Sequence, residues 1–277
     1  MSAEPKAELG KLRTEQVDEK FHLLDIMSIS ELLKAMNESD ADVPKAISLQ
    51  LPAIERAIDV IVDRLMQGGR LIYIGAGTSG RLGVVDASEC PPTYGVPHDW
   101  VIGLIAGGDS AIRKAVENAE DDEKQAWLDM EAYGINSLDT VIGIAASGRT
   151  PYVIGGLRDA NARGILTGCI VCNAGSAVAA EAKFPVEVVV GPEYVTGSTR
   201  MKSGTAQKLV LNMLSTAVMI QLGRVRGNKM VDMQLSNHKL VLRAIRMVRE
   251  ATGVSDEVAA ELLEKHGSVR NAVDAIQ

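Results

Sequence analysis

The sequence is poor in aromatic side chains, which make up 3% of its 277 residues and include only two Phe and two Trp. Platforms that stack nucleobases or sugar rings need exposed aromatic rings, so no such platform is expected. Basic residues are outnumbered by acidic ones, and the net charge of -7 with a pI near 5.2 disfavours nucleic acids and anionic membranes as partners. Any anionic ligand must therefore be held by a local cluster of N–H groups and basic side chains.

Long apolar runs are absent too. The most apolar stretch, residues 209–222, is interrupted by Asn212, Ser215 and Thr216 and is too short to span a bilayer. The first residues lack the basic-then-apolar order of a secretion signal. We therefore expect a cytoplasmic protein with no membrane partner.

Cysteine and histidine are scarce. Cys169 and Cys172 form a C-x-x-C, but it falls in an apolar run, residues 165–171, that is typical of a buried strand. A redox pair favours the start of a helix, and residues three apart on a strand point to opposite faces, so we expect inert buried thiols in a reducing cytosol. The four His show no metal-ligand spacing, and no metal site is expected.

The first quarter of the chain has helical patterns. Ser28, with Glu31 three residues later, fits a capping box, and Pro44 suits a first helical turn. From Ile54 onward the apolar residues recur on one face of a helix, which Gly68 should end.

Five short apolar runs bounded by glycine follow, with helical segments between most of them. The runs are residues 71–74, 101–106, 141–145, 165–171 and 186–190. Strand, turn and helix repeated in this way predict an α/β fold with a doubly wound parallel five-stranded sheet and flanking helices. Ligands of such sheets bind at the carboxyl ends of the strands, where loops meet helix N-termini.

We divide the chain into N-terminal helices (residues 1–50), the sheet domain (51–224) and C-terminal helices (225–277). The helix expected over residues 205–222 is apolar nearly all round, so it is predicted to be buried in the core or at a dimer seam. Another helix is expected over residues 237–250.

Three loops combine hydroxyls, glycines and N–H groups just before a helix, which is what a single phosphate needs. The first strand runs into residues 75–81, a literal G-x-G-x-x-G, but no acid for a ribose ends the second strand, so a dinucleotide site is disfavoured. The third strand repeats Ser-Gly-Arg at residues 147–149, and a third loop spans residues 196–205. One such loop is more often a plain N-cap. Three at equivalent ends of one sheet favour a phosphate site.

The candidate substrate-binding residues come from these loops, with the hydroxyls as phosphate ligands. They are Gly77, Thr78, Ser79, Ser147, Gly148, Arg149, Thr150, Ser198, Thr199 and Lys202.

Two acidic segments could supply general acid–base groups. Glu89 is followed by Pro91 and Pro92, which are expected to stop helix continuation and fix its direction. An acidic run, residues 117–123, follows the second strand; a solvated helix end is its ordinary explanation. One carboxylate of this run facing the same pocket as Glu89 would allow the two to divide acid and base work, but spacing alone does not rank Glu117 against Glu120.

Four phrases together resemble the N-acetylmuramic acid 6-phosphate etherases. They are residues 75–81, 86–95, 143–152 and 195–202, and the likeness runs from about residue 51 to about residue 251. The resemblance implies a cytoplasmic homodimeric enzyme built on a sugar isomerase (SIS) domain. Its activity would be cleavage of the lactyl ether of the phosphosugar to N-acetylglucosamine 6-phosphate and D-lactate, in cell-wall recycling.

The resemblance also implies residue roles. The family's acid lies in a Ser-Glu-Cys-Pro phrase, here Glu89, and its second carboxylate in a Glu-x-Ala-Glu-Asp phrase maps to Glu120. Glu89 would protonate the leaving lactate, Glu120 would act as the base, and no metal or organic cofactor is implied. The Asn-His-Lys-Leu phrase contains Lys239, a candidate to reach a neighbouring subunit's pocket.

The sequence departs from the family at Asp18, where the family usually has an asparagine after Thr-Glu-x-x. Two other functions on the same fold stay open. One is a non-catalytic phosphosugar-binding regulator, as in the related glucokinase regulatory protein. The other is an aldose–ketose phosphate isomerase, which needs a base but no acid for a leaving group.

Overall fold

Five parallel strands form the central sheet of the computed structural model, which describes residues 12–276. The strands are β1 (Leu71–Gly75), β2 (Val101–Ile105), β3 (Thr140–Ala145), β4 (Leu166–Val171) and β5 (Phe184–Glu187). Their order is β2-β1-β3-β4-β5, so the winding reverses between β1 and β3. The predicted doubly wound parallel sheet is confirmed.

The last strand begins earlier than its apolar run predicted. Pairing with β4 starts at Phe184 and ends where Glu187 meets Val171, the last residue of β4. Val188 and Val190 are buried beyond the last paired residue, and the N–H of Val188 donates to the carbonyl of Val171 at the end of the ladder.

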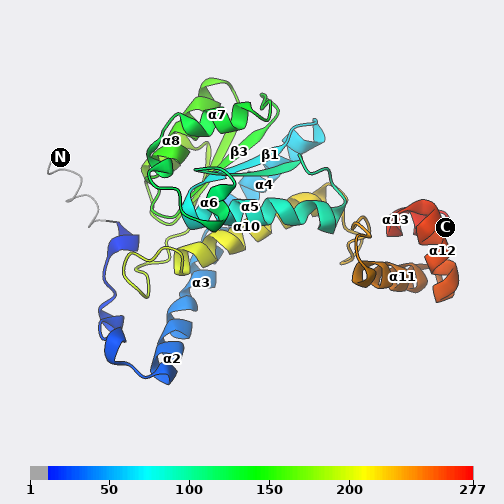
Figure 1. The fold of residues 1–277 in the computed structure, drawn as a ribbon, viewed down its shortest axis with the longest axis horizontal. Helices are drawn as coiled ribbons and strands as arrows, with labels where there is room; N and C mark the ends of the chain where they lie inside the picture. Colours follow the sequence, from blue (N-terminus) through cyan, green and yellow to red (C-terminus); the bar gives the residue numbers. More distant parts are fainter. Residues whose placement is uncertain (1–11, 277) are drawn as a thin grey trace.

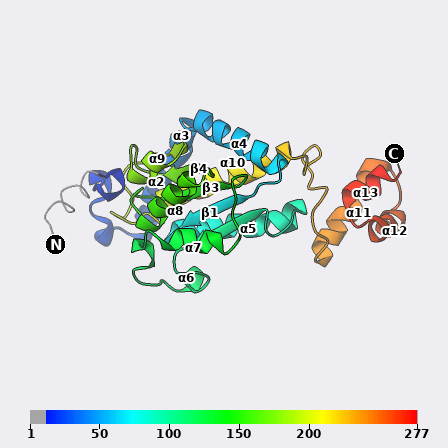
Figure 2. The same ribbon diagram turned by 90° about the horizontal axis from the view of Figure 1, so that it is seen from above.

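Helices cover both faces of the sheet (Figures 1 and 2). One face carries α4 (Leu51–Met66), α5 (Gly77–Tyr94) and α10 (Lys202–Gln221), and the other carries α7 (Gln125–Glu131), α8 (Pro151–Ala162) and α9 (Ala177–Glu181). Side chains of β1 alternate between the two cores: Leu71 and Tyr73 join the first, and Ile72 and Ile74 the second.

The cysteine prediction is confirmed. Cys169 packs in the core under α8, while Cys172 packs in the core under α10, on the other face of the sheet. Burial raises the pKa of both thiols to about 12. Two thiols on opposite faces, both protonated at neutral pH, are not a redox pair.

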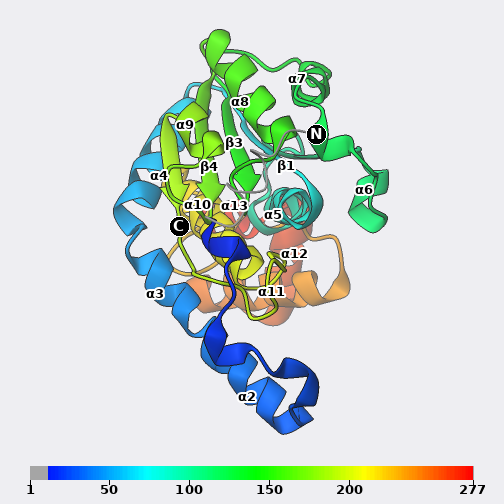
Figure 3. The ribbon, with the colours of Figure 1, turned by 90° about the vertical axis from the view of Figure 1, so that its left-hand side faces the viewer.

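The remaining elements lie at the edges and ends of the molecule. They are η1 (Arg13–Glu15), η2 (Glu19–Phe21), η3 (Leu24–Ile26), α2 (Ile29–Asp40), α3 (Asp42–Ser48), α6 (Ser110–Arg113), η4 (Ala119–Asp121), α11 (His238–Thr252), α12 (Asp256–His266) and α13 (Val269–Asp274). The predicted capping box of Ser28 and Glu31 begins α2, which extends away from the sheet (Figure 3). None of the helices described is long and apolar enough to cross a membrane.

The expectation that the two prolines end the helix at Glu89 is wrong. Helix α5 continues through Pro91 and Pro92 to Tyr94. Each proline removes one helical hydrogen bond, but both lie in the last turn, so the loss is confined to the end of the helix. Gly95, at φ +64°, then closes α5 by donating its N–H to the carbonyl of Pro91.

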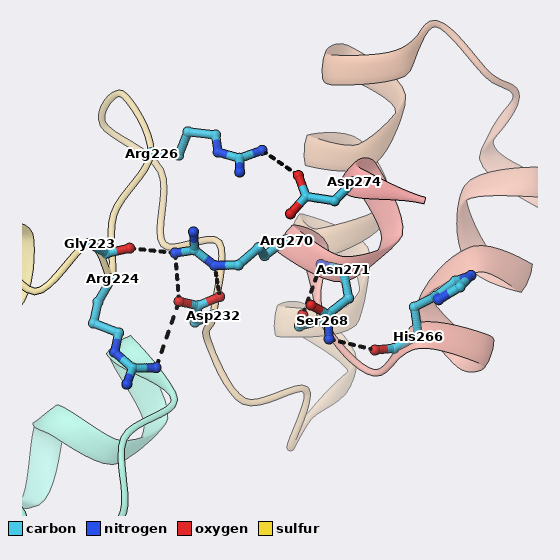
Figure 4. Close-up of polar contacts among 9 residues, drawn as sticks. All are labelled: Gly223, Arg224, Arg226, Asp232, His266, Ser268, Arg270, Asn271 and Asp274. Atoms are coloured by element: carbon cyan, nitrogen blue, oxygen red, sulfur yellow. Dashed lines mark hydrogen bonds and ion pairs between the residues drawn. The ribbon is translucent and has the colours of Figure 1, made fainter. Parts of the chain in front are cut away.

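The three C-terminal helices pack around a small core of their own, at the end of the molecule opposite the N-terminal segment (Figure 1). Figure 4 shows how the segment before α11 is tied to α13. The guanidinium of Arg270 donates to both carboxylate oxygens of Asp232 at 2.7 Å, and Arg226 pairs with Asp274 at 2.9 Å. The N–H of Gln234 donates to the carbonyl of Pro92, which joins this end to α5.

Candidate active site

The loops after β1 and β3 lie side by side where the winding of the sheet reverses. The two strands pair directly, from Leu71 with Thr140 to Gly75 with Ile144, and each runs into a helix. This is the switch point at which ligands of doubly wound sheets bind. Two of the three predicted phosphate loops therefore meet at one place.

The first turn of α5 is open. No side chain caps it, and the N–H groups of Gly77, Thr78 and Ser79 have no carbonyl of the same helix to reach. The turn sits directly on the end of β1, because a Cβ on Gly80 would lie 2.7 Å from the carbonyl oxygen of Gly75. Three N–H groups at the positive end of an 18-residue helix make this turn a candidate site for an anion.

The loop after β3 carries two hydroxyl residues, Ser147 and Thr150. Gly148 has φ +71°, and a Cβ there would lie 2.2 Å from Oγ of Ser176, so only glycine fits between this loop and the next. The N–H of Arg149 donates to Oγ of Ser147 at 3.3 Å, and Thr150 precedes the first turn of α8.

Asn173 hydrogen-bonds to the N-terminal segment next to the strand ends, a role that the sequence did not predict. Its side chain is buried, and Nδ2 donates to Oγ1 of Thr14 at 3.0 Å and to the carbonyl of Ser147 at 3.3 Å. Its Oδ1 accepts from the N–H of Arg13 at 2.8 Å. The only signal available was a polar residue directly after a buried strand.

Asp18, at which this chain departs from the family, stabilises a short helix. Its carboxylate accepts the N–H of Lys20 at 3.1 Å and caps η2. The neighbouring Glu15 reaches the third loop, since a Cβ on Gly197 would lie 3.2 Å from Oε2 of Glu15. The residues before Asp18 therefore border the predicted phosphate loops.

The third loop differs from the expectation, because its helix N–H groups are already used. Glu193, fully buried, accepts the N–H of Lys202 at 2.8 Å and both the N–H and the hydroxyl of Ser203 at 2.9 and 2.6 Å. The N–H of Gly204 donates to the carbonyl of Thr199. The first turn of α10 thus offers no bare N–H, and Ser198 and Thr199 remain as half-buried hydroxyl residues.

Glu120 lines a cavity that begins at the open turn of α5. The cavity has a volume of about 210 Å³ and is lined by Gly77, Glu117 and Glu120 among others. Asn118, at φ +60°, turns the chain between the two glutamates. Arg81 also lines it, but its guanidinium donates to the carbonyls of Ala111 and Ile112, which fixes the far wall.

Glu89 lies elsewhere in the chain. It is exposed, twelve residues after Gly77, and therefore about 18 Å along α5 at 1.5 Å per residue. It lines a hollow of about 60 Å³ with Asp86 and Lys208. Glu120 and Glu89 therefore line different cavities of the chain.

Asp86, which lines the same hollow as Glu89, is a carboxylate with a raised pKa. It accepts the hydroxyls of Tyr73 at 2.9 Å and Ser215 at 3.0 Å, which join β1, α5 and α10. Burial raises the pKa of Asp86 to about 6, against the lowering effect of these hydrogen bonds.

Profiles of known domains match most of the chain. The N-terminal SIS domain of glucokinase regulatory protein matches residues 53–161, and the general SIS domain matches residues 119–217. The C-terminal lid domain of glucokinase regulatory protein matches residues 227–273.

Full-length relatives decide the family. A Christiangramia forsetii protein named N-acetylmuramic acid 6-phosphate etherase is 60% identical over 95% of both chains. One of the same name from Bacteroides thetaiotaomicron is 58% identical over 91% of both. The chain belongs to the N-acetylmuramic acid 6-phosphate etherase family. A solved phosphoheptose isomerase from Francisella tularensis, 18% identical with a TM-score of 0.55 over 70% of this chain and 100% of that one, has the same fold.

In this member of the etherase family, the predicted site residues fall into two groups. One group gathers around the carboxyl ends of the strands and includes the three loops and Glu120. The other group is distant: Glu89 lies far along α5, and Lys239 is exposed in the first turn of α11, at the opposite end of the molecule.

Proposed function

We propose that this chain cleaves the D-lactyl ether of N-acetylmuramic acid 6-phosphate in the cytoplasm, giving N-acetylglucosamine 6-phosphate and D-lactate for cell-wall sugar recycling. The observation that carries the proposal is the open first turn of α5 at the head of a cavity lined by Glu120. Near-full-length relatives of this name support the choice of substrate.

The phosphate group binds at the N-terminus of α5. The N–H groups of Gly77 to Ser79 and the hydroxyls of Ser79 and Ser147 contact its oxygens, which suits a dianion in an otherwise acidic protein. This binding energy is remote from the reacting carbons and serves to orient them.

The reaction is an elimination followed by hydration. The sugar ring opens to its aldehyde, which acidifies the proton on the neighbouring carbon. Glu120 removes that proton, the electron pair forms a carbon–carbon double bond, and the bond to the lactyl oxygen breaks as Glu89 protonates that oxygen. Water then adds across the unsaturated aldehyde. General acid–base help of this kind contributes about a hundred- to ten-thousandfold.

The proposal includes a homodimer, because Glu89 and Lys239 are distant from the loops of their own chain. A surface groove of about 710 Å³ between α4 and α10 is lined by exposed apolar side chains, Leu51, Met213 and Ile220 among them. The groove and the hollow of Glu89 share Asn212. A second copy seated on this groove covers the apolar surface and meets Glu89, which then serves the partner's pocket.

A D-lactate assay with N-acetylmuramic acid 6-phosphate tests the activity. Wild type releases lactate, and Glu120→Gln and Glu89→Gln each lower the rate by about a hundredfold or more. Binding of the phosphosugar without lactate release would show a regulator instead. Isomerised sugar phosphate without lactate would show an isomerase.

Mixing the two inactive variants tests the shared site. In a randomly reassembled mixture about half of the dimers carry one subunit of each variant, and each such dimer has one site with both carboxylates intact. Activity recovers to about a quarter of wild type if Glu89 crosses the interface. No recovery in a mixture that sedimentation shows to be dimeric would place both carboxylates on one chain.

A further inference from the structure

Gln207 is buried on α10 and faces the open turn of α5. It is 1% exposed, and its Oε1 accepts the hydroxyl of Ser79 at 2.9 Å. Its Nε2 is buried without a hydrogen-bond partner among the described residues. Buried amide nitrogens are nearly always paired, so this atom marks a place where the hydrogen bonding is incomplete.

The hydrogen bond from Ser79 conflicts with a bound phosphate. A hydroxyl has one proton, and here that proton points to Gln207. A phosphoryl oxygen accepts but does not donate, so Ser79 must turn its proton toward the phosphate. Oε1 would then face the lone pairs of Ser79, acceptor against acceptor.

Rotating the Gln207 amide by half a turn removes the conflict. Nε2 then donates to Oγ of Ser79, and the proton of Ser79 is free for the anion at the N–H groups of Gly77 and Thr78. The donor that lacks a partner gains one, and the Ser79 hydroxyl becomes a better donor because its oxygen accepts a hydrogen bond.

We propose that Gln207 is a positioning residue for the phosphate group, which acts by setting the direction of the Ser79 hydroxyl. The inference rests on the proposed function, since it assumes that the phosphate binds at the α5 turn. It assigns to α10 a part in phosphate binding that its own capped N-terminus does not supply.

Isothermal titration with N-acetylglucosamine 6-phosphate tests this on the full-length protein. Gln207→Leu and Ser79→Ala are each expected to weaken binding about tenfold, the loss of one hydrogen bond to a charged group. The double variant should lose no more than either single variant, because both remove the same bond. Gln207→Glu should bind more weakly than Gln207→Leu, because a carboxylate holds the Ser79 proton and repels the phosphate. In turnover, Gln207→Leu should raise KM more than it lowers kcat.

Ser215→Ala is the matched control. Ser215 joins α10 to α5 through Asp86, away from the open turn, so its loss removes a hydroxyl bond between the same helices without touching Ser79. It should bind the phosphosugar like wild type. If Gln207→Leu and Ser215→Ala weaken binding equally, or if Gln207→Leu and Ser79→Ala are additive, Gln207 only packs the helices and the inference is overturned.

Different results would overturn the proposed function and the role of Gln207. A wild type that does not bind N-acetylglucosamine 6-phosphate overturns the proposed function. Wild-type binding that depends on Ser79 but not on Gln207 overturns this inference alone. Should the Gln207 variants not fold, a crystal of wild type with the phosphosugar decides: Oγ of Ser79 should lie within hydrogen-bond distance of both a phosphate oxygen and the Gln207 amide, and an amide turned away from Ser79 contradicts the proposal.

Discussion

Two helix N-termini lie next to each other at the carboxyl end of the sheet, and they differ in one respect. The first turn of α10 is closed by Glu193, which accepts from Lys202 and Ser203. The first turn of α5 has no side-chain cap, and only the hydroxyl of Ser79 is engaged, by Gln207. Both turns are rich in Ser, Thr and Gly, so the difference comes from a buried carboxylate that one has and the other lacks.

Two helix N-termini of similar composition can therefore differ in use. The protein's own carboxylate closes the turn of α10, and the turn of α5 has no such partner. A helix N-terminus that already holds a carboxylate has its N–H groups satisfied and its dipole countered, so a second anion gains little there. An uncapped one leaves that interaction to a ligand.

Removing Glu193, the buried cap of α10, should have the largest effect on stability. Glu193→Ala leaves two N–H groups and a hydroxyl buried without partners, and we expect the free energy of unfolding to fall by about 4 kcal/mol. Urea denaturation followed by circular dichroism measures it. Glu193→Gln keeps an acceptor and should lose less. Equal midpoints for wild type and Glu193→Ala would refute the comparison.

The pH dependence of the contact between α5 and α10 at Asp86 comes next. The pKa of Asp86 in the folded protein, about 6, is above its ordinary value of 3.8, so the native state holds this proton to higher pH than the unfolded state. Stability from this group is full below about pH 4 and falls as pH rises through 6, by roughly 2–3 kcal/mol. Unfolding of wild type and Asp86→Asn at pH 4 to 8 measures it. A difference between the two that stays constant with pH contradicts the assignment.

Two serine variants sharpen the comparison directly. Ser79→Ala should weaken binding of N-acetylglucosamine 6-phosphate about tenfold, and the loss of its bond to buried Gln207 should lower stability by about 1 kcal/mol. Ser203→Ala removes the hydroxyl bond to Glu193 and should lower stability by about 1 kcal/mol with binding unchanged. Titration and urea unfolding of both variants check this. The reverse pattern would mean that α10, not α5, receives the phosphate.

The ion pairs at the C-terminal end should contribute least to stability. Arg226→Ala breaks a pair with Asp274 in which both side chains are about half exposed, so we expect a loss below about 1 kcal/mol. Arg270→Ala, whose partner Asp232 is better buried, should cost more. Thermal unfolding at low and high salt measures both. A larger loss for Arg226→Ala would show that the exposed pair, and not the buried one, holds this end together.

Much of the fold followed from local patterns. Apolar runs bounded by glycine marked all five strands, and alternation within them placed Cys169 and Cys172 on opposite faces. The prolines after Glu89 misled, because two prolines in a last turn cost little helix. The boundaries at residues 50 and 224 stay predictions.

The candidate site was only partly predictable. Ser79 and Ser147 stand in loops with a recognisable composition. Glu193 and Gln207 carry no local signal, and Asn173 has only that of a polar residue after a buried strand. Their roles depend on partners far along the chain: Gln207 bonds Ser79 across 128 positions, and Asn173 bonds Thr14 across 159.

The strands, the hydroxyl-rich loops and the family were all predictable without the structure, because they depend on periodicity and on short contiguous phrases. The folded structure was needed to show which helix N-terminus is closed and which is open, and that Glu89 and Glu120 line different cavities. The physical reason is that hydrogen bonds and cavities join atoms by distance in space, and the packing of α5 against α10 sets those distances.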